Sequence, residues 1–198
     1  MEQTENMSPT RQRTVSSIRT AFLALLSERP FETITVRTIC EAAKVSKFTF
    51  YNYYCDKYAL AEAIRENFID GLCSAIEVPE FSEKGNKERS EKVYRYVFEK
   101  KEEYHALTTL TLNGVNFNQR LLERLQVLTL RQIEDGVKRS GYPCRPEAAV
   151  FFSHMMASGE LAELEIIANG LLTQEQLARF QKEAALLNSA LLQKIRAL

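Results

Sequence analysis

Apolar residues recur three and four positions apart along most of this chain, which is the period of an amphipathic helix. Alternation with period two never lasts long enough to build a sheet, and most of the 7 glycines and 5 prolines stand where the helical period stops. We therefore predict an all-α protein with about nine helices. The expected helices cover approximately residues 11–27, 35–43, 46–53, 56–76, 88–101, 104–112, 116–139, 148–166 and 177–191.

The stretch 34–53 reads as two short helices joined by a tight turn. Thr35 and Ser46 can each start a helix, because a hydroxyl accepts hydrogen bonds from the free N–H groups of the first turn. The first helix places apolar residues such as Val36 and Ile39 on one face. The second carries more aromatic and hydrogen-bonding side chains than a core helix needs, so we predict a helix-turn-helix unit that binds DNA.

The helical segments divide into two predicted domains. Residues 8–55 form a three-helix DNA-binding domain whose first helix has Arg11, Arg13 and Arg19 on its outer side. A longer helix, 56–76, connects this domain to the rest. Residues 77–87 combine proline, glycine, serine and charges and are predicted to be a linker. Residues 77–198 then form a helical domain for regulation and dimerisation.

The last two helices carry apolar seams with alternating spacings of three and four, a pattern that packs as a left-handed bundle. The seam of helix 177–191 is wider than one neighbouring helix needs, which favours a two-fold dimer built as a four-helix bundle. The alternative is that both seams belong to the intramolecular core. The predicted interface residues are Phe152, Gly159, Ala162, Ile166, Phe180, Ala184, Leu187 and Leu191.

Charge is unevenly distributed, although the 26 basic and 26 acidic residues balance overall. Residues 8–60 carry eight basic and four acidic side chains, so this segment is basic and the remainder is mildly acidic. A basic N-terminal part on an acidic body is expected if only the N-terminal part meets phosphates.

Several other functions find little support in the sequence. There is no glycine-rich phosphate loop and no GxSxG or HExxH motif, so we expect no enzyme, although a thiol enzyme built on Cys73 or Cys144 is conceivable. The 4 cysteines include no CxxC pair, and we expect reduced, buried thiols, no metal and no cofactor. No apolar run is long enough for a bilayer and no secretory signal is present, so we expect a cytoplasmic protein without a membrane partner.

The helix-turn-helix stretch resembles the TetR/AcrR-type transcriptional regulators. The resemblance lies in a pattern like T-V-R-x-I-x-x-A-A-x-V-S-x-x-T-x-Y-x-Y-[FY]-x-x-K-x-x-L, which covers about a quarter of the chain. Lys44 stands in the turn where the family usually has glycine, so either Lys44 takes a left-handed backbone at some cost or the turn geometry differs a little. Phe48 replaces a small residue of the recognition helix. The matching residues are Thr35, Val36, Arg37, Ile39, Ala42, Ala43, Val45, Ser46, Thr49, Tyr51, Tyr53, Lys57 and Leu60.

The resemblance implies a role for each side of the recognition helix. Thr49, Tyr53 and Lys57 would hold phosphates and Tyr51 would lie at the DNA surface. Within the major groove, lysine can bind guanine, asparagine can pair with adenine, and a phenylalanine ring can lie against a thymine methyl group. Arg37 is a second candidate guanine reader. The predicted DNA-binding set is Thr35, Arg37, Ser46, Lys47, Phe48, Thr49, Tyr51, Asn52, Tyr53 and Lys57.

The resemblance also implies a switch, most often a repressor that releases double-stranded operator DNA when a small molecule binds. Helix 56–76 starts beside the DNA and ends in the regulatory half, so movement of its far end would change the spacing of two recognition helices in a homodimer. An alternative is a helical dimer that acts as a protein-interaction module without DNA binding. The predicted pocket for the unidentified effector is lined by Tyr96, Tyr104, His105, Phe117, Phe151, His154 and Met155, although such residues also occur as plain core.

Overall fold

The computed structural model describes residues 8–77, 83–141, 144–180 and 182–183 of the 198-residue chain. The helical elements confirm the all-α fold class. In chain order the elements are α1 Pro9–Glu28, the 3-10 turn η1 Phe31–Thr33, α2 Val36–Ala43, α3 Lys47–Tyr51, α4 Lys57–Ile76, α5 Glu83–Glu99, α6 Lys101–Thr108, β1 Thr111–Leu112, β2 Val115–Asn116, α7 Phe117–Ser140 and α8 Pro146–Ala168. Residues 174–180 form a further helix.

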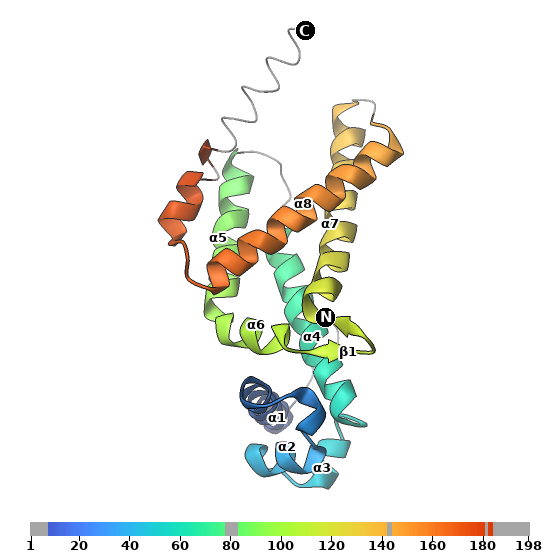
Figure 1. Cartoon of the computed structure of the whole chain (residues 1–198), viewed down its shortest axis with the longest axis vertical. Coiled ribbons are helices and arrows are strands. Elements are labelled where there is room, and N and C mark those ends of the chain that lie inside the picture. Colours follow the sequence, from blue (N-terminus) through green and yellow to red (C-terminus); the bar gives the residue numbers. More distant parts are fainter. Residues whose placement is uncertain (1–7, 78–82, 142–143, 181, 184–198) are drawn as a thin grey trace.

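Helices α1, α2 and α3 gather at one end of the molecule, around the start of α4 (Figure 1). Their shared core contains Ile18 of α1, Ile39 of α2 and Phe50 of α3, all completely buried. Phe31 and Ile34, in and after the turn η1, close this core from the side. Burying each such side chain contributes roughly 1.5–3 kcal/mol, which compensates for the short lengths of α2 and α3.

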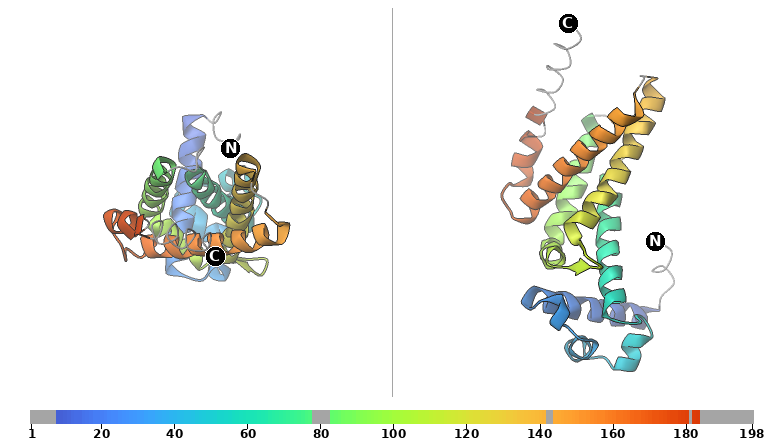
Figure 2. Two further views of the ribbon diagram at one scale, coloured as in Figure 1. Left: turned by 90° about the horizontal axis from the view of Figure 1, so that it is seen from above. Right: turned by 45° about the vertical axis from the view of Figure 1, so that its right-hand side comes forward.

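Helix α4 leaves this end and runs into the second group of helices (Figure 2, right). Asp56 caps its start, because the Ala59 N–H donates to Asp56 Oδ1 at 2.7 Å. Its apolar stripe stays buried along the whole length, so the core of α1–α3 continues without interruption into that of α5–α8. The stripe consists of Leu60, Ile64, Phe68, Leu72 and Ile76.

Polar contacts fasten α4 and α1 to the second group of helices. Arg120 of α7 donates to Glu66 of α4 at 2.9 Å. Arg19 of α1 donates both to Asn67 of α4, at 2.8 Å, and to Glu103 of α6. The prediction that Arg19 faces solvent is therefore wrong, because α6 covers that side of α1.

Helices α7 and α8 lie side by side across the second group (Figure 1). The face of α8 toward α7 is made of small residues, including Ser153 and Ala157, which lets the two backbones approach closely. The Thr129 hydroxyl of α7 lies 2.9 Å from the Leu125 carbonyl of its own helix and 3.1 Å from the Ser153 carbonyl of α8, so this buried hydroxyl has acceptors on both helices.

Two connections differ from the prediction. Helix α5 begins at Glu83, inside the predicted linker, because glutamate and lysine around Gly85 favour a helix enough to outweigh one glycine. The connection between the predicted helices 104–112 and 116–139 is a tight hairpin turn between β1 and β2, with φ of 52° at Asn113 and 78° at Gly114. None of the described helices is long and apolar enough to cross a bilayer.

Candidate nucleic-acid interface

Side-chain caps begin both helices of the helix-turn-helix unit. The Thr38 N–H donates to the Thr35 hydroxyl at 3.2 Å, and the Thr38 hydroxyl accepts in return from the Thr35 N–H. Ser46 starts α3 by accepting from the Thr49 N–H at 3.0 Å. Lys44 ends α2 in the left-handed region, with φ 56° and ψ 41°. Of the two alternatives for this turn, the left-handed backbone is therefore the one observed.

Helix α3 presents one face to solvent and buries the other. Phe50 is completely buried, whereas Phe48 is 77% exposed and Tyr51 is 54% exposed. Lys47 and Asn52, at the two ends of α3, are exposed as well. The buried phenylalanine fixes the rotation of α3, so these four residues form one outward surface of amino, amide and aromatic groups. Groups of this kind can read base edges in a major groove.

Thr49 and Tyr53 flank this surface and are half-buried. The Thr49 hydroxyl lies 2.8 Å from the Ser46 hydroxyl, so each can still turn a hydrogen or a lone pair outward. Arg37 is exposed and donates to Glu41, one turn later on α2, at 2.8 Å. The hydrogen bond with Glu41 raises the pKa of Arg37. Exposed pairs of this type are weak, so Arg37 can exchange Glu41 for another acceptor.

Lys57 makes contacts within the protein that the sequence did not predict. Its ammonium donates to the carbonyl oxygens of Phe31, Glu32 and Ile34 at 2.9, 3.1 and 2.8 Å. It also lies 4.5 Å from the centre of the Phe31 ring. Burial lowers the pKa of Lys57 and Glu32 opposes that effect. All three N–H donors are used within the protein in this conformation, so a phosphate contact would require Lys57 to leave these carbonyls, and that contact stays a prediction.

Arg11 is a residue that periodicity alone did not assign to this surface. Its guanidinium carbon lies 5.7 Å from the centre of the Tyr53 ring. The sequence-based expectation placed Arg11 on the solvent side of α1. The available signal was its position seven residues before Ile18, which puts both on one stripe of the helix.

Cations at this end of the molecule have few acidic neighbours. In the described residues, Arg11, Lys44 and Lys47 have no carboxylate oxygen within the 4.0 Å of an ion pair. By contrast, Arg89 of α5 pairs with Glu160 at 2.8 Å, as other arginines of the second group pair with acids. Several cations near α3 are thus without an acidic partner in the described part of the chain, whereas Arg89, Arg120 and Arg124 of the second group are paired, and this contrast suits a polyanion at the α3 end.

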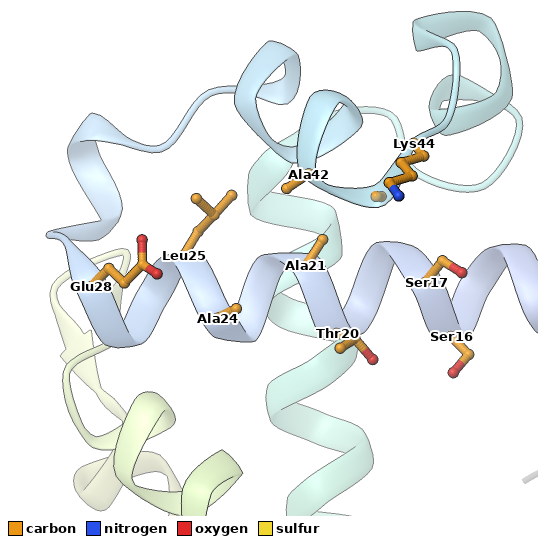
Figure 3. Close-up of a pocket in the computed structure, with 10 residues that line it drawn as sticks. Ser16, Ser17, Thr20, Ala21, Ala24, Leu25, Glu28, Ala42 and Lys44 are labelled. Carbon is orange, nitrogen blue, oxygen red and sulfur yellow. The ribbon is translucent and has the colours of Figure 1, made fainter.

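A groove of about 600 Å³ lies between α1 and α2 (Figure 3). The sequence did not predict it. Most of its walls are small side chains, with Glu28 and Lys44 at its ends. It opens widely to solvent and its small walls offer no convergent set of polar groups. Its lining is Ser16, Ser17, Thr20, Ala21, Ala24, Leu25, Glu28, Ala42, Ala43 and Lys44.

The residues of the predicted effector pocket do not share one cavity wall. Tyr104 and Phe117 are buried with ring centres 5.8 Å apart, and Phe68 of α4 packs on both. Tyr96 joins them by donating to the Phe68 carbonyl at 2.8 Å. Beside this cluster, His105 Nε2 lies 3.1 Å from the Ala168 carbonyl oxygen.

The other three predicted pocket residues lie on the outer face of α8. Phe151 is 61% exposed, Met155 is 57% exposed and His154 is exposed too. The prediction of one common pocket is therefore corrected: helical position, rather than aromatic character, separates the two groups. Only the first group is in contact with α4.

The predicted dimer residues lie mostly on the surface of the single chain. Phe152 is 50% exposed and Phe180 is 49% exposed, while Gly159 and Ala162 are exposed and Ile166 is half-buried. The intramolecular face of α8 uses other positions, such as Ala157 and Leu164. The dimer stays a prediction. Ala184, Leu187 and Leu191 lie outside the described residues.

The four cysteines are free thiols. Cys40 is buried, and burial raises its pKa. Cys55 is exposed and Cys73 and Cys144 are half-buried, so the expectation of buried thiols holds only for Cys40. Cys55 follows the recognition helix directly, where the chain turns over the surface toward α4.

The N-terminal part of the chain matches a known protein family. Residues 18–64, from the middle of α1 into α4, match the family model described as bacterial regulatory proteins, tetR family. The chain is also 39% identical over 61 residues to YxbF, an HTH-type transcriptional regulator of Bacillus subtilis (strain 168). That match covers 31% of this chain but only 16% of YxbF.

Solved structures resemble the chain over most of its length. The dihydroxyacetone kinase operon activator DhaS has a TM-score of 0.60 at 25% identity, with 88% of this chain and 95% of DhaS covered. A TetR-family transcriptional regulator from Syntrophomonas wolfei has a TM-score of 0.67 at 20% identity, with 85% and 91% covered. The latter likeness shows a shared fold.

Proposed function

We propose that this chain, which belongs to the TetR family of bacterial regulatory proteins, binds palindromic operator DNA as a homodimer and thereby controls transcription. One observation carries the proposal. Helix α3 is anchored by Phe50 and turns Lys47, Phe48, Tyr51 and Asn52 outward, beside cations that have no acidic partner among the described residues.

The proposed base contacts follow from the chemistry of the exposed face of α3. Lys47 donates to guanine O6 or N7, Asn52 pairs with adenine, and Phe48 lies against a thymine methyl group. Tyr51 lies at the DNA surface. Thr49 and Tyr53, with the capping hydroxyls of Thr35 and Ser46, contact phosphates and set the register. Arg37 becomes a second guanine reader when it leaves Glu41.

The proposed homodimer uses the outer face of α8 and the helix that follows it. The exposed side chains of Phe152 and Met155 are large and apolar, and burying them against a second copy removes them from water. The two copies would place two α3 helices about 34–36 Å apart, or at a related spacing, to reach two half-sites of one operator.

The proposed switch acts through α4. The aromatic cluster is centred on Phe68 of this helix, and its other members are Tyr96, Tyr104 and Phe117, which pack against the Phe68 ring. A small apolar or amphipathic molecule that inserts there would displace α4 and change the spacing of the two α3 helices. Operator affinity would then fall by the factor by which the effector prefers the displaced state.

We propose repression as the direction of control, because a dimer on a promoter excludes other proteins from it. The structural relative at 25% identity is an activator by its name. A reporter gene behind the chain's own promoter, with and without the regulator, separates the two: higher expression without the regulator supports repression, and lower expression overturns it.

The test of DNA binding is fluorescence anisotropy with a labelled duplex from the region upstream of the chain's own gene. For six to ten phosphate contacts, affinity should fall about 10³- to 10⁵-fold between 50 and 200 mM salt. Lys47→Ala should relax the preference at one base pair. Lys138→Ala is the matched control, because Lys138 is exposed on α7 and pairs with Asp135. If the protein binds no duplex even at low salt, this proposal fails and the result supports the alternative of a protein-interaction module.

A further inference from the structure

Arg11 occupies a place that solvent exposure alone does not explain. It lies on the stripe of α1 that continues through Ile18 to Leu25, both of which are buried in the core. At Arg11 the core has ended, and its guanidinium lies instead over the ring of Tyr53, 5.7 Å from the ring centre. The first turns of α1 are thereby brought beside the end of α3.

The charge of Arg11 is held in position but not neutralised. Among the described residues no carboxylate lies within 4.0 Å of it, whereas Arg19, farther along the same helix, is paired with Glu103. An aromatic face attracts a guanidinium that lies over it and packs against the aliphatic stem of the arginine. The guanidinium N–H groups remain free to donate to another acceptor. A free, pre-oriented guanidinium can donate to a phosphate in a two-pronged geometry.

We infer that Arg11 is a further DNA contact, in which Tyr53 positions its guanidinium to bind a backbone phosphate at the flank of the half-site read by α3. This inference rests on the proposed function. The ligand is one phosphodiester of duplex DNA, taken between the Arg11 guanidinium and the Tyr53 hydroxyl. The contact carries no base information, so it raises the affinity for all sequences alike and fixes the register of α3.

Arg13 provides an unusually close control. It has the same charge and is exposed on the same turn of α1, but it lies two residues on and therefore about 200° around the helix. A general loss of positive charge would affect both variants, whereas a phosphate contact held by Tyr53 affects only Arg11.

The experiment measures duplex affinity by anisotropy across a range of salt concentrations, with the promoter duplex and with a mixed-sequence duplex. Arg11→Ala should weaken both by on the order of tenfold and lower the slope of log K against log salt by about 0.9 per protomer. Arg13→Ala should keep the wild-type slope. Arg11→Lys should retain most of the slope, because it keeps the charge.

Two further variants separate contact from structure. Arg11→Gln keeps the packing of the stem without the charge, so it replaces Arg11→Ala if that variant folds poorly by thermal melting. In a Tyr53→Leu background, Arg11→Ala should have a smaller effect than in the wild type, because the ring no longer holds the guanidinium.

The outcomes are distinct. A wild-type slope in Arg11→Ala and Arg11→Gln, or an equal loss in Arg13→Ala, overturns the inference while the wild-type protein still binds DNA. A wild-type protein that binds neither duplex overturns the proposed function itself.

Discussion

Replacing Lys57 by methionine separates a stabilising role from a DNA-binding one. The substitution removes three hydrogen bonds from a charged donor to the carbonyls of Phe31, Glu32 and Ile34, and the attraction to the Phe31 ring. Methionine retains most of the apolar contact, and water can reach part of the freed carbonyls. We expect a net loss of about 2–3 kcal/mol of unfolding free energy. For a chain of this length, that lowers the melting temperature by about 5–10 °C.

Lys47→Met is the matched substitution, because Lys47 is exposed on α3 and makes no ion pair in the described part of the chain. Thermal melting followed by circular dichroism gives the stability, and anisotropy at several salt concentrations gives the DNA affinity and, from its slope, the number of phosphate contacts. Lys57→Met should melt early with an unchanged salt slope. Lys47→Met should melt like the wild type and lose DNA affinity.

The reasoning is refuted if Lys57→Met melts at the wild-type temperature and loses as much salt dependence as a lost phosphate contact requires. That result would mean that Lys57 exchanges its carbonyl partners for DNA. Arg or Gln at this position would not serve as well, because each brings new donors to the same carbonyls.

Three further changes test other features. Lys44→Gly should raise the melting temperature by about 2–4 °C, because glycine adopts φ 56° without strain, whereas Lys44→Ala should not. Burial raises the pKa of Tyr104 to about 12, and the charge of Glu165 adds to this shift. The neutral Tyr104 therefore stabilises the folded state fully below pH 10.0, its ordinary pKa, and this contribution is lost as the pH rises from 10.0 to about 12. In urea titrations, the unfolding free energy of Tyr104→Phe should fall less than that of the wild type between these pH values. An equally steep fall in both proteins would show that Tyr104 does not cause the pH dependence. Phe152→Glu should convert dimers to monomers in light scattering while Phe98→Glu, equally 50% exposed but on α5, should not.

Local features were predictable from the sequence because their causes are local. The helix starts at Thr35, Ser46 and Asp56 depend on one side chain and the N–H groups within three residues of it. The left-handed turn at Lys44 was one of two alternatives, drawn from the glycine that the family it resembles usually has there. The all-α fold likewise follows from a period that repeats within each segment.

Long-range partners were not predictable, because no period encodes them. Lys57 binds carbonyls of a turn more than twenty residues earlier, and a sequence pattern does not show which backbone groups lack partners. Arg19 is polar and was therefore expected to face solvent, although it pairs with Glu103. Arg11 is exposed as expected, but its contact with the Tyr53 ring was not predicted. The predicted pocket combined residues of similar chemistry whose helical positions face opposite ways.

The contacts of Arg19 have a mechanical consequence. One guanidinium joins α1 to both α4 and α6, through Asn67 and Glu103. A domain that is joined to the rest of the protein through one helix can rotate about that helix. A domain held at two points rotates only when these two points move relative to each other. The end of the molecule that carries α3 is held at two points, by α4 itself and by α6 through Arg19. A displacement shared equally by α4 and α6 would therefore carry α3 along unrotated, and only a difference between the two would tilt it.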